Sequence, residues 1–246
     1  VDYLWQLTGN AAAFYYGVLW NKLYRLDLIQ MAHIRFEHVV YAEDQLFNTR
    51  YLQVAQRFAA INEAAYCYIQ NPQSVCHTQV SQRPGAEAFR RICPHPQPHL
   101  RKGEPMEFPL VSIIVPMYNT AGCIARCVKS ICAQTYKSIE ILLLNDGSTD
   151  DTLAVCRKLA AADSRIRVVD KPNTGAADTR SCGLALAHGE YIQFADSDDH
   201  LLPGCTANLV AAMQRSHADL VLAPYRMMVP RKDGGYDTRE YSLLPA

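Results

Sequence analysis

The hydrophobic pattern of the chain changes character near residue 108. From there to residue 246, short continuous apolar runs alternate with stretches whose apolar residues recur every three to four positions. Continuous runs predict strands that are buried on both faces, and the three-to-four spacing predicts helices. Strands are predicted at 111–115, 139–144, 166–169, 191–194 and 219–223, and helices at about 124–131, 153–161, 176–188 and 202–216. The alternation predicts an α/β fold with an open, mostly parallel sheet flanked by helices and joined by right-handed crossovers.

Residues 1–80 form a different region, which is rich in aromatic side chains and mixes helical with extended patterns. Its clearest helix is predicted from Glu43 to about Gln56, because apolar residues there recur on one face. Acidic residues in its first turn suit the positive end of the helix dipole. Residues 57–70 predict one or two short strands, so this region is expected to be α+β.

The two regions are separated by a segment that predicts no regular structure. Residues 81–107 contain five of the 13 prolines of the chain, and hydrophobic periodicity vanishes there. Proline removes a backbone donor and breaks helices, so this segment is expected to be a linker. The predicted organisation is therefore 1–80, a linker at 81–107, and 108–246. The chain begins at Val1 and stops at Ala246, which predicts a fragment of a longer protein.

Composition narrows the function classes. Lys and Arg number 24 and so do Asp and Glu, giving a formal net charge of zero. A nucleic-acid-binding protein would be basic, and so would a polybasic membrane anchor. No apolar run reaches the length of a membrane-spanning helix. Nine cysteines are too few for a disulfide scaffold, and their odd number favours a reducing cytoplasm. Peripheral attachment at the inner membrane face stays open.

Ligands of open α/β sheets bind beyond the carboxyl ends of the strands, and polar residues gather there in this sequence. The strand at 191–194 is followed by Asp196, Asp198 and Asp199, with one serine between the first two. Three neighbouring carboxylates repel one another, and a divalent cation such as Mg²⁺ or Mn²⁺ would relieve the repulsion. The alternative is a solvated acidic turn that caps a helix.

The strand at 139–144 ends in the sequence NDGSTDD, which begins at Asn145. Its glycine turn and hydroxyl groups could hold a base or a ribose, or they could only cap the following helix. The chain has no G-x-x-x-x-G-K-[ST] loop, and no G-x-G-x-x-G follows a strand. Walker-type NTPases and dinucleotide-binding folds are therefore unsupported.

Taken together, VSIIVPMYN, LLLNDGSTDDT, NTGAADTRSCGLALAHG and YIQFADSDD resemble the nucleotide-binding half of the inverting glycosyltransferases of family 2, over about residues 109–224. The resemblance implies a GT-A-type, Rossmann-like sheet and a nucleoside-diphosphate sugar donor, with UDP as the nucleotide. Ser181 departs from the family pattern, which has Asn there. By the same resemblance, the base, ribose and donor sugar contact these residues: Pro116, Tyr118, Asn119, Asp146, Asn173, Gly175, Arg180 and Asp196. The DXD motif implies Mg²⁺ or Mn²⁺ bound by Asp198, with Asp196 and Asp199 alongside.

Residues 1–80 resemble the acceptor-binding half of the same family, through WNKLYRLDLI, IRFEHVVYAEDQLFNTRYL and INEAAYCYIQNPQSV. The Glu43-Asp44 pair matches its catalytic ED motif, in which Asp is the general base. Where many relatives have Tyr-Arg-x-Arg, this chain has Tyr68-Ile69-Gln70-Asn71, so two cations are missing. The halves are in reverse order, which predicts either a piece of two tandem glycosyltransferase domains or a circular permutation. Docking of 1–80 onto 108–246 is compatible with both.

The resemblance implies metal-dependent, inverting transfer of a sugar to a hydroxyl of a glycan or lipid-linked glycan, typically in surface or capsular polysaccharide synthesis. Two alternatives from other classes stay open. The chain could be a non-catalytic nucleotide-sugar-binding fragment of a tandem glycosyltransferase. It could also be a nucleotidyltransferase, although the basic glycine-rich loop typical of that class is absent after the first strand of the sheet.

Overall fold

A computed structural model describes residues 18–39, 43–70, 108–231 and 233–241. The predicted linker and the first aromatic residues of the chain lie outside these ranges. The helices are α3 (Leu26–Met31), α4 (Glu43–Val54), α6 (Ile124–Cys132), α7 (Thr152–Ala162), α8 (Ala176–Leu186) and α9 (Cys205–Ser216). The strands are β1 (Lys22–Arg25), β2 (Phe58–Ala60), β3 (Tyr66–Ile69), β4 (Val111–Met117), β5 (Ile139–Asp146), β6 (Ile166–Lys171), β7 (Tyr191–Phe194), β8 (His200–Leu201), β9 (Leu220–Leu222), β10 (Tyr225–Pro230) and β11 (Tyr236–Tyr241).

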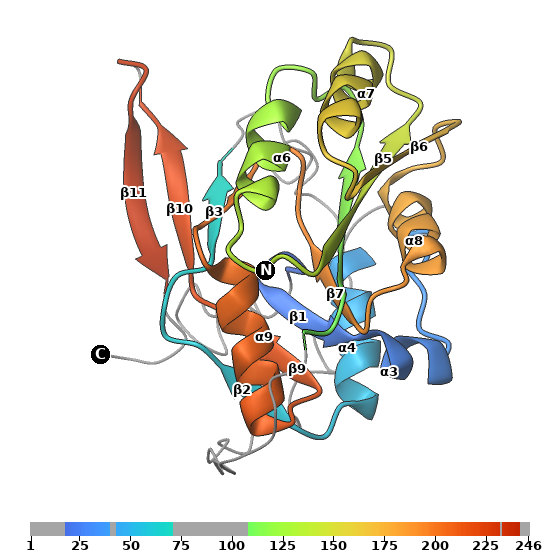
Figure 1. The fold of residues 1–246 in the computed structure, drawn as a ribbon, viewed down its shortest axis with the longest axis vertical. Helices are drawn as coiled ribbons and strands as arrows, with labels where there is room; N and C mark the ends of the chain where they lie inside the picture. Colours follow the sequence, from blue (N-terminus) through green and yellow to red (C-terminus); the bar gives the residue numbers. More distant parts are fainter. Residues whose placement is uncertain (1–17, 40–42, 71–107, 232, 242–246) are drawn as a thin grey trace.

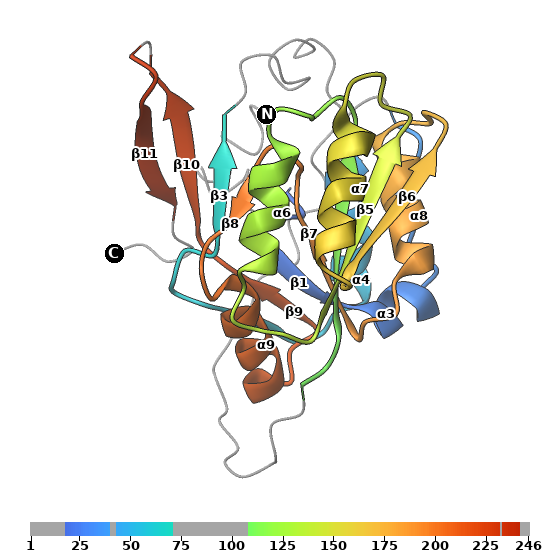
Figure 2. The same cartoon turned by 45° about the horizontal axis from the view of Figure 1, so that its top comes forward.

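A sheet in the order β2-β9-β1-β7-β4-β5-β6 forms the centre of the described part of the chain. Strand β1 is antiparallel to both of its neighbours, and the other pairs in this sheet are parallel. Helices α6, α7 and α9 cover one face, and α4 and α8 cover the other (Figures 1 and 2). The predicted α/β class with a mostly parallel sheet is confirmed.

The strands and helices predicted for residues 108–223 are all present. Helix α9 begins at Cys205, three residues later than predicted, because Gly204 adopts a left-handed conformation with φ of 77°. Helix α8 packs against β4 and β5 at Gly183. A Cβ atom at Gly183 would lie 2.5 Å from the side chain of Ile114 and 2.8 Å from that of Leu144. This close approach fixes α8, and therefore Arg180, against the sheet.

Residues 18–69 complete the same sheet. Strand β1 lies between β7 and β9, and β2 extends the edge beyond β9. The pairing of Leu23 with Gln193 and with Val221 sets this register. Helix α4, predicted from Glu43 to about Gln56, is confirmed with the bounds Glu43–Val54. The first region is thus placed beside the carboxylate loop that follows β7, although the division of the chain into domains stays a prediction.

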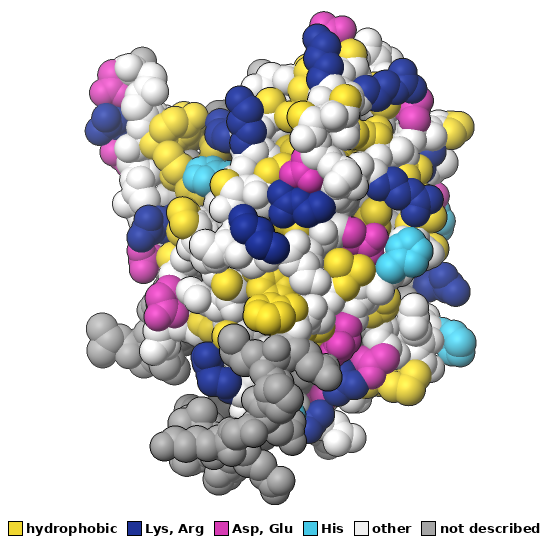
Figure 3. All heavy atoms as spheres, viewed as in Figure 1, with side chains coloured by type: hydrophobic (Ala, Val, Ile, Leu, Met, Phe, Trp, Pro, Cys, Tyr) yellow, Lys and Arg dark blue, Asp and Glu magenta, His cyan; other side chains and the backbone are white. Residues whose placement is uncertain are grey.

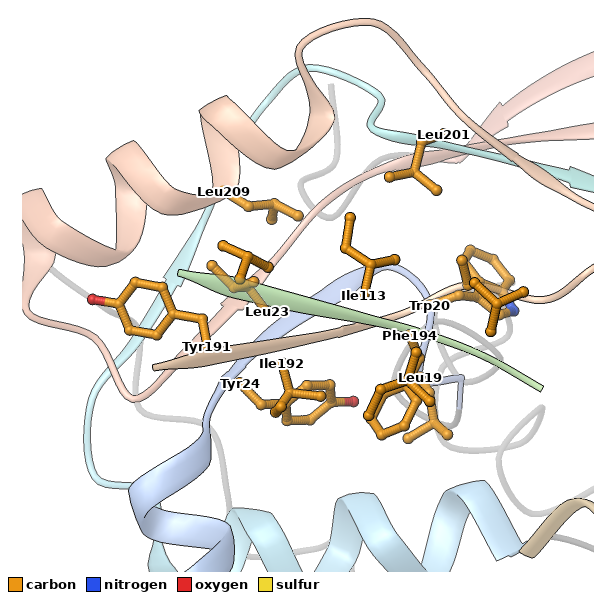
Figure 4. Packing of buried hydrophobic residues seen from close by; sticks show 14 of the residues in the cluster. Leu19, Trp20, Leu23, Tyr24, Ile113, Tyr191, Ile192, Phe194, Leu201 and Leu209 are labelled. Atoms are coloured by element: carbon orange, nitrogen blue, oxygen red, sulfur yellow. The ribbon is translucent and has the colours of Figure 1, made fainter. Parts of the chain in front are cut away.

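The hydrophobic core follows the alternation of side chains along the central strands. Leu23 and Ile113 point toward α9 and Leu209, whereas Tyr24 and Phe194 point toward α4 on the opposite face (Figure 4). All five side chains are buried. Tyr24 packs edge-on against Phe194, with 5.9 Å between ring centroids. Burial of a large apolar side chain stabilises by about 1.5–3 kcal/mol, so these contacts hold the first region on the sheet.

A second sheet in the order β11-β10-β3-β8 stands beside α6 (Figure 2). The two strands predicted for residues 57–70 separate between the sheets, β2 into the first and β3 into the second. Trp20 stacks on Tyr66 of β3 with a centroid separation of 4.4 Å and meets Tyr225 of β10 edge-on at 5.0 Å. The hairpin of β10 and β11 was not predicted, because β11 is exposed along almost its entire length and has no alternating pattern.

Candidate active site

Two polar clusters lie at the carboxyl ends of the parallel strands. One surrounds Asp146, at the end of β5. The other surrounds the acidic loop after β7 and includes the start of α4. We call these the Asp146 cluster (Asp146, Lys171, Thr174 and Gly175) and the acidic cluster (Glu43, Asp44, Arg180, Asp196, Asp198 and Asp199).

In the Asp146 cluster, the buried Asp146 carboxylate receives hydrogen bonds from three donors of the protein. Its Oδ1 accepts hydrogen bonds from the backbone N–H of Thr174 at 2.9 Å and from the Lys171 ammonium group. Its Oδ2 accepts the backbone N–H of Gly175 at 2.9 Å, at the start of α8. Gly175 has φ of 91°, a conformation that favours glycine. Although burial acts in the opposite direction, these donors hold the pKa of Asp146 below its ordinary value.

The loop after β4 is joined to the loop after β5. The Asn119 side chain accepts the backbone N–H of Thr149 at 2.8 Å, and the Asn119 N–H donates to the Ser148 hydroxyl at 3.0 Å. Asn119 has φ of 52°, in the left-handed region that Asn tolerates better than most residues. Tyr118 beside it is half exposed, so its ring is free to meet a flat ligand. Pro116 lies in β4, two residues before Tyr118, and is partly buried.

The ends of β5 and β6 border a cavity of about 380 Å³. Gly147 shapes its rim, because a Cβ atom there would lie only 2.7 Å from the backbone nitrogen of Asn173. The cavity does not reach the acidic cluster. Its lining consists of Asn145, Gly147, Ser148, Leu153, Asp170, Lys171 and Pro172.

The acidic cluster is held by one arginine from α8. The Arg180 Nη1 lies 2.8 Å from Glu43 Oε1 and 3.2 Å from Asp44 Oδ1, and its Nη2 lies 3.4 Å from Asp196 Oδ1. Only 9% of the Arg180 side chain is exposed, and its guanidinium group lies 5.9 Å from the centre of the Phe36 ring. One cation therefore connects the ED pair of α4 with the first carboxylate of the DXD motif.

Asp198 and Asp199 are held differently. Asp199 is fully buried, and its Oδ1 accepts the backbone N–H of Ile69 in β3 at 2.7 Å. Its Oδ2 is buried and has no hydrogen-bond partner among the described residues. The carbonyl oxygen of Asp198 accepts a hydrogen bond from Arg126 of α6 at 2.5 Å. The backbone N–H of Asp196 donates to the Tyr66 hydroxyl at 2.9 Å.

One guanidinium group does not offset the desolvation of these carboxylates. Burial raises the pKa of Asp44 to about 7, with Glu43 adding to the shift and Arg180 opposing it. Burial also raises the pKa of Asp196 and of Asp198. For Asp199, burial and the two neighbouring aspartates raise the pKa well above the ordinary value. The cluster holds more negative charge than its own cations balance, which is a property of sites that take up a proton or a metal ion.

The donor set fits a hard divalent cation that shares its coordination with a ligand. Among the described residues, no three His, Cys, Asp or Glu side chains converge as a complete metal centre. Mg²⁺ and Mn²⁺ need oxygen ligands, and Mg²⁺ often takes only one or two carboxylates together with substrate phosphates. The carboxylates of Asp196 and Asp198, whose pKa values are raised by burial, meet that requirement.

Of the residues predicted from the sequence, Asp146 and Gly175 lie in the Asp146 cluster, and the acidic cluster contains six more. Pro116, Tyr118, Asn119 and Asn173 lie outside both clusters, at the end of β4 and in the loops at the sheet edge. Arg180 joins the two regions of the chain. Lys171 was missed as a partner of Asp146, although it stands at the end of a predicted strand. Phe36 beneath Arg180 and the buried Lys22 were also missed. Lys22 is 1% exposed and donates to the Asn21 side chain at 2.7 Å. No spacing in the sequence marks these contacts, because they depend on the strand order.

The comparisons with known proteins establish the family of the chain. The family model for glycosyl transferase family 2 matches residues 112–237. The chain belongs to this family. It is 40% identical to the glycosyltransferase GlyG of Streptococcus pneumoniae serotype 4 (strain ATCC BAA-334 / TIGR4) over 117 residues, which are 47% of this chain and 39% of GlyG. It is 42% identical to the chondroitin synthase of Pasteurella multocida (strain Pm70) over 115 residues, which are 47% of this chain and 11% of the synthase.

A solved structure, the mannosyltransferase PcManGT from Pyrobaculum calidifontis in complex with GDP-Man and Mn²⁺, aligns with a TM-score of 0.41 and 29% identity. The alignment covers 43% of this chain and 32% of that one. At this TM-score the family assignment rests on the sequence match. The matched part of the chain spans well under half of the length of either curated relative. None of the described helices has the length and apolarity that crossing a membrane requires.

Proposed function

We propose that the chain carries a metal-dependent, inverting glycosyltransferase site, which transfers a sugar from a nucleoside-diphosphate sugar to a hydroxyl of a glycan. The observation that carries this proposal is the Arg180 contact, which places the Glu43-Asp44 pair beside Asp196 of the DXD motif. A donor-binding loop and a candidate base thereby share one guanidinium group. The family membership supplies the reaction class.

The Asp146 cluster is the proposed nucleotide end of the site. The ionised Asp146 can only accept hydrogen bonds, so it suits a base N–H or a ribose hydroxyl. Tyr118 and Pro116 would contact the base, and Asn119 and Asn173 would shape the loops around it. Gly175 holds the turn into α8. We propose UDP as the nucleotide, as the family resemblance implies.

The acidic cluster is the proposed reaction end. Asp198, with Asp196 and Asp199 alongside, would hold Mg²⁺ or Mn²⁺, which supplies Lewis-acid stabilisation to the departing diphosphate. Asp44 would accept the proton from the acceptor hydroxyl as its oxygen bonds to the anomeric carbon. The bond from that carbon to the β-phosphate oxygen breaks, and its electron pair leaves with the diphosphate. Attack from the opposite side inverts the anomeric centre.

A pKa of about 7 suits Asp44 to this role, because a base is most effective when its pKa lies near the operating pH. Glu43 and Asp44 both contact Arg180, and Glu43 would orient the Arg180 guanidinium group beside Asp44. The acceptor is proposed to be a glycan or a lipid-linked glycan, in polysaccharide synthesis. The name of the Pasteurella multocida relative, chondroitin synthase, supports this setting.

Calorimetric titration of the chain with UDP, with and without Mn²⁺, tests the proposal. We expect Asp198→Asn to abolish metal-dependent UDP binding, because it removes a charged ligand. We expect Asp44→Asn to retain binding and to lose transfer by about 10²–10⁴-fold, the usual contribution of a positioned base. Asp237→Asn, on the exposed strand β11, is the matched control and should alter neither quantity.

Two results would contradict the assignments. Unchanged metal-dependent binding in Asp198→Asn would remove this residue from the metal site. Full transfer by Asp44→Asn would remove it as the base. UDP binding without any transfer by the wild-type chain would favour the alternative, a nucleotide-sugar-binding fragment of a tandem glycosyltransferase.

A further inference from the structure

Arg126 is a cation beside the acidic loop that the proposed mechanism does not use. It lies in the first turn of α6, which follows β4 at the edge of the sheet where the carboxyl ends lie. Its side chain is exposed, and its Nη2 donates to the carbonyl oxygen of Asp198 at 2.5 Å. This contact places the guanidinium group at the backbone of the DXD motif and uses one of its five N–H donors.

The charge of Arg126 is not consumed by an ion pair. Among the residues that the structure describes, none places a carboxylate oxygen within 4.0 Å of its guanidinium group. Three other described cations near the site are engaged. Arg180 contacts three carboxylates, Lys171 bonds to Asp146, and the buried Lys22 donates to the Asn21 side chain. The described cation that remains available beside the metal-binding loop is therefore Arg126.

The surroundings of Arg126 also favour an anion. Helix α6 contains no acidic residue, and its N-terminus carries the positive end of the helix dipole. Lys and Arg side chains are spread over α6 and α7 on this face of the molecule (Figure 3). The first turn of α6, which carries Arg126, thus stands next to a loop of three carboxylates. A ligand that carries both phosphate oxygens and a divalent cation complements both.

We propose that Arg126 is a donor-binding residue that contacts the diphosphate of the nucleotide sugar, an assignment that rests on the proposed function. A diphosphate leaving group gains negative charge as the bond to the anomeric carbon breaks. Guanidinium groups form paired, charge-assisted hydrogen bonds with phosphate oxygens, and Arg126 has four donors left for this purpose. It recognises the phosphates rather than the base.

The test compares UDP with UMP, in Mn²⁺-containing buffer, by calorimetry on the whole chain. The UDP-to-UMP affinity ratio isolates the β-phosphate. We expect Arg126→Gln to lower UDP affinity about tenfold and UMP affinity less than twofold. Arg126→Lys should have a UDP-to-UMP affinity ratio between those of the wild type and Arg126→Gln, because lysine keeps the charge but cannot form paired hydrogen bonds. Lys129→Gln removes one positive charge from the same helix one turn farther on, and should leave the ratio unchanged.

The outcomes separate this assignment from the proposed function. An unchanged UDP-to-UMP affinity ratio in Arg126→Gln would overturn the assignment. An equal fall of this ratio in Lys129→Gln would also overturn it, because it would indicate a general effect of positive charge on α6. Failure of the wild-type chain to bind UDP would instead contradict the proposed nucleotide. Because Arg126 is exposed and makes one contact, its variants should keep the wild-type midpoint in urea denaturation.

Discussion

The two carboxylate clusters at the edge of the sheet are built in opposite ways. Asp146 receives two backbone N–H groups and an ammonium group, and its pKa lies below the ordinary value. Glu43, Asp44 and Asp196 share one guanidinium group. Burial raises the pKa values of Asp44 and of the three aspartates after β7. The first cluster is complete within the chain, whereas the second has an excess of negative charge.

This difference indicates what kind of ligand each cluster suits. A carboxylate that the chain already satisfies is a fixed acceptor, which suits recognition of a ligand without a change of protonation. Burial destabilises the ionised form of carboxylates that are only partly neutralised, so binding of a proton or a cation stabilises them. We propose on this ground that the Asp146 cluster serves recognition and the acidic cluster serves the chemistry.

The largest effect is expected from Arg180→Met, which removes the cation that the acidic cluster shares. The variant leaves Glu43, Asp44 and Asp196 without their common partner in a largely buried setting. Loss of one partner of a buried ion pair costs about 3–5 kcal/mol. We expect a loss of this size in urea denaturation at pH 7, together with loss of transfer.

The loss in Arg180→Met should shrink at pH 5, because the carboxyl groups with raised pKa values then become neutral. Arg215→Gln, at the exposed end of α9, is the control and should cost less than about 1 kcal/mol. A cost below that value in Arg180→Met, at neutral pH, would show that the three carboxylates do not depend on Arg180.

How far the sequence predicts this arrangement differs between its parts. Strands such as β4 and β5 were predicted because their side chains are buried on both faces and therefore form continuous apolar runs. Strand β1 was not, because its four residues include Lys22 and Arg25, and a buried lysine carries no hydrophobic signal. Motifs at strand ends predicted Asp146 and the three aspartates after β7 as site residues, whereas Glu43 and Asp44 were named from the family resemblance.

Partners across the clusters could not be predicted from spacing. Arg180 and Glu43 are 137 positions apart, and they meet because β1 inserts beside β7 and carries α4 to the face that α8 covers. The resemblance to family 2 named these residues separately. Their contact, and the choice of Lys171 as the partner of Asp146, depend on tertiary structure.

A second test uses the opposite pKa shifts. Because the pKa of Asp146 is lowered, its contribution to stability is present above its ordinary pKa and is lost as the pH falls through the folded value. Because the pKa of Asp44 is raised from 3.8 to about 7, the folded state retains a proton that the unfolded state has released, so stability falls as the pH rises from about 4 to 7.

Urea denaturation between pH 3 and 8 measures this difference. We expect the free energy of unfolding of Asp44→Asn to rise relative to the wild type between pH 4 and 7. A shift from 3.8 to about 7 corresponds to at most about 4 kcal/mol at 1.36 kcal/mol per pKa unit, and solvent screening of a side chain that is 24% exposed reduces the expected gain to about 2 kcal/mol. Asp146→Asn should be less stable than the wild type at neutral pH, and this difference in stability should disappear only below pH 4. Parallel curves for the two variants would contradict the proposed contrast.

The smallest expected effect comes from Lys171→Met, which removes one of the donors to Asp146 and keeps the length of the side chain. The two backbone N–H groups remain, so the carboxylate stays partly satisfied. A hydrogen bond to a charged group contributes about 1.5–3 kcal/mol, and 16% exposure of the Lys171 side chain places the loss at the lower end. The pKa of Asp146 should rise toward its ordinary value, measurable by NMR titration. Lys158→Met, on the exposed face of α7, is the control. A much larger loss would mean that Asp146 depends on the ammonium group, as the acidic cluster depends on Arg180, and that the two clusters differ in degree rather than in design.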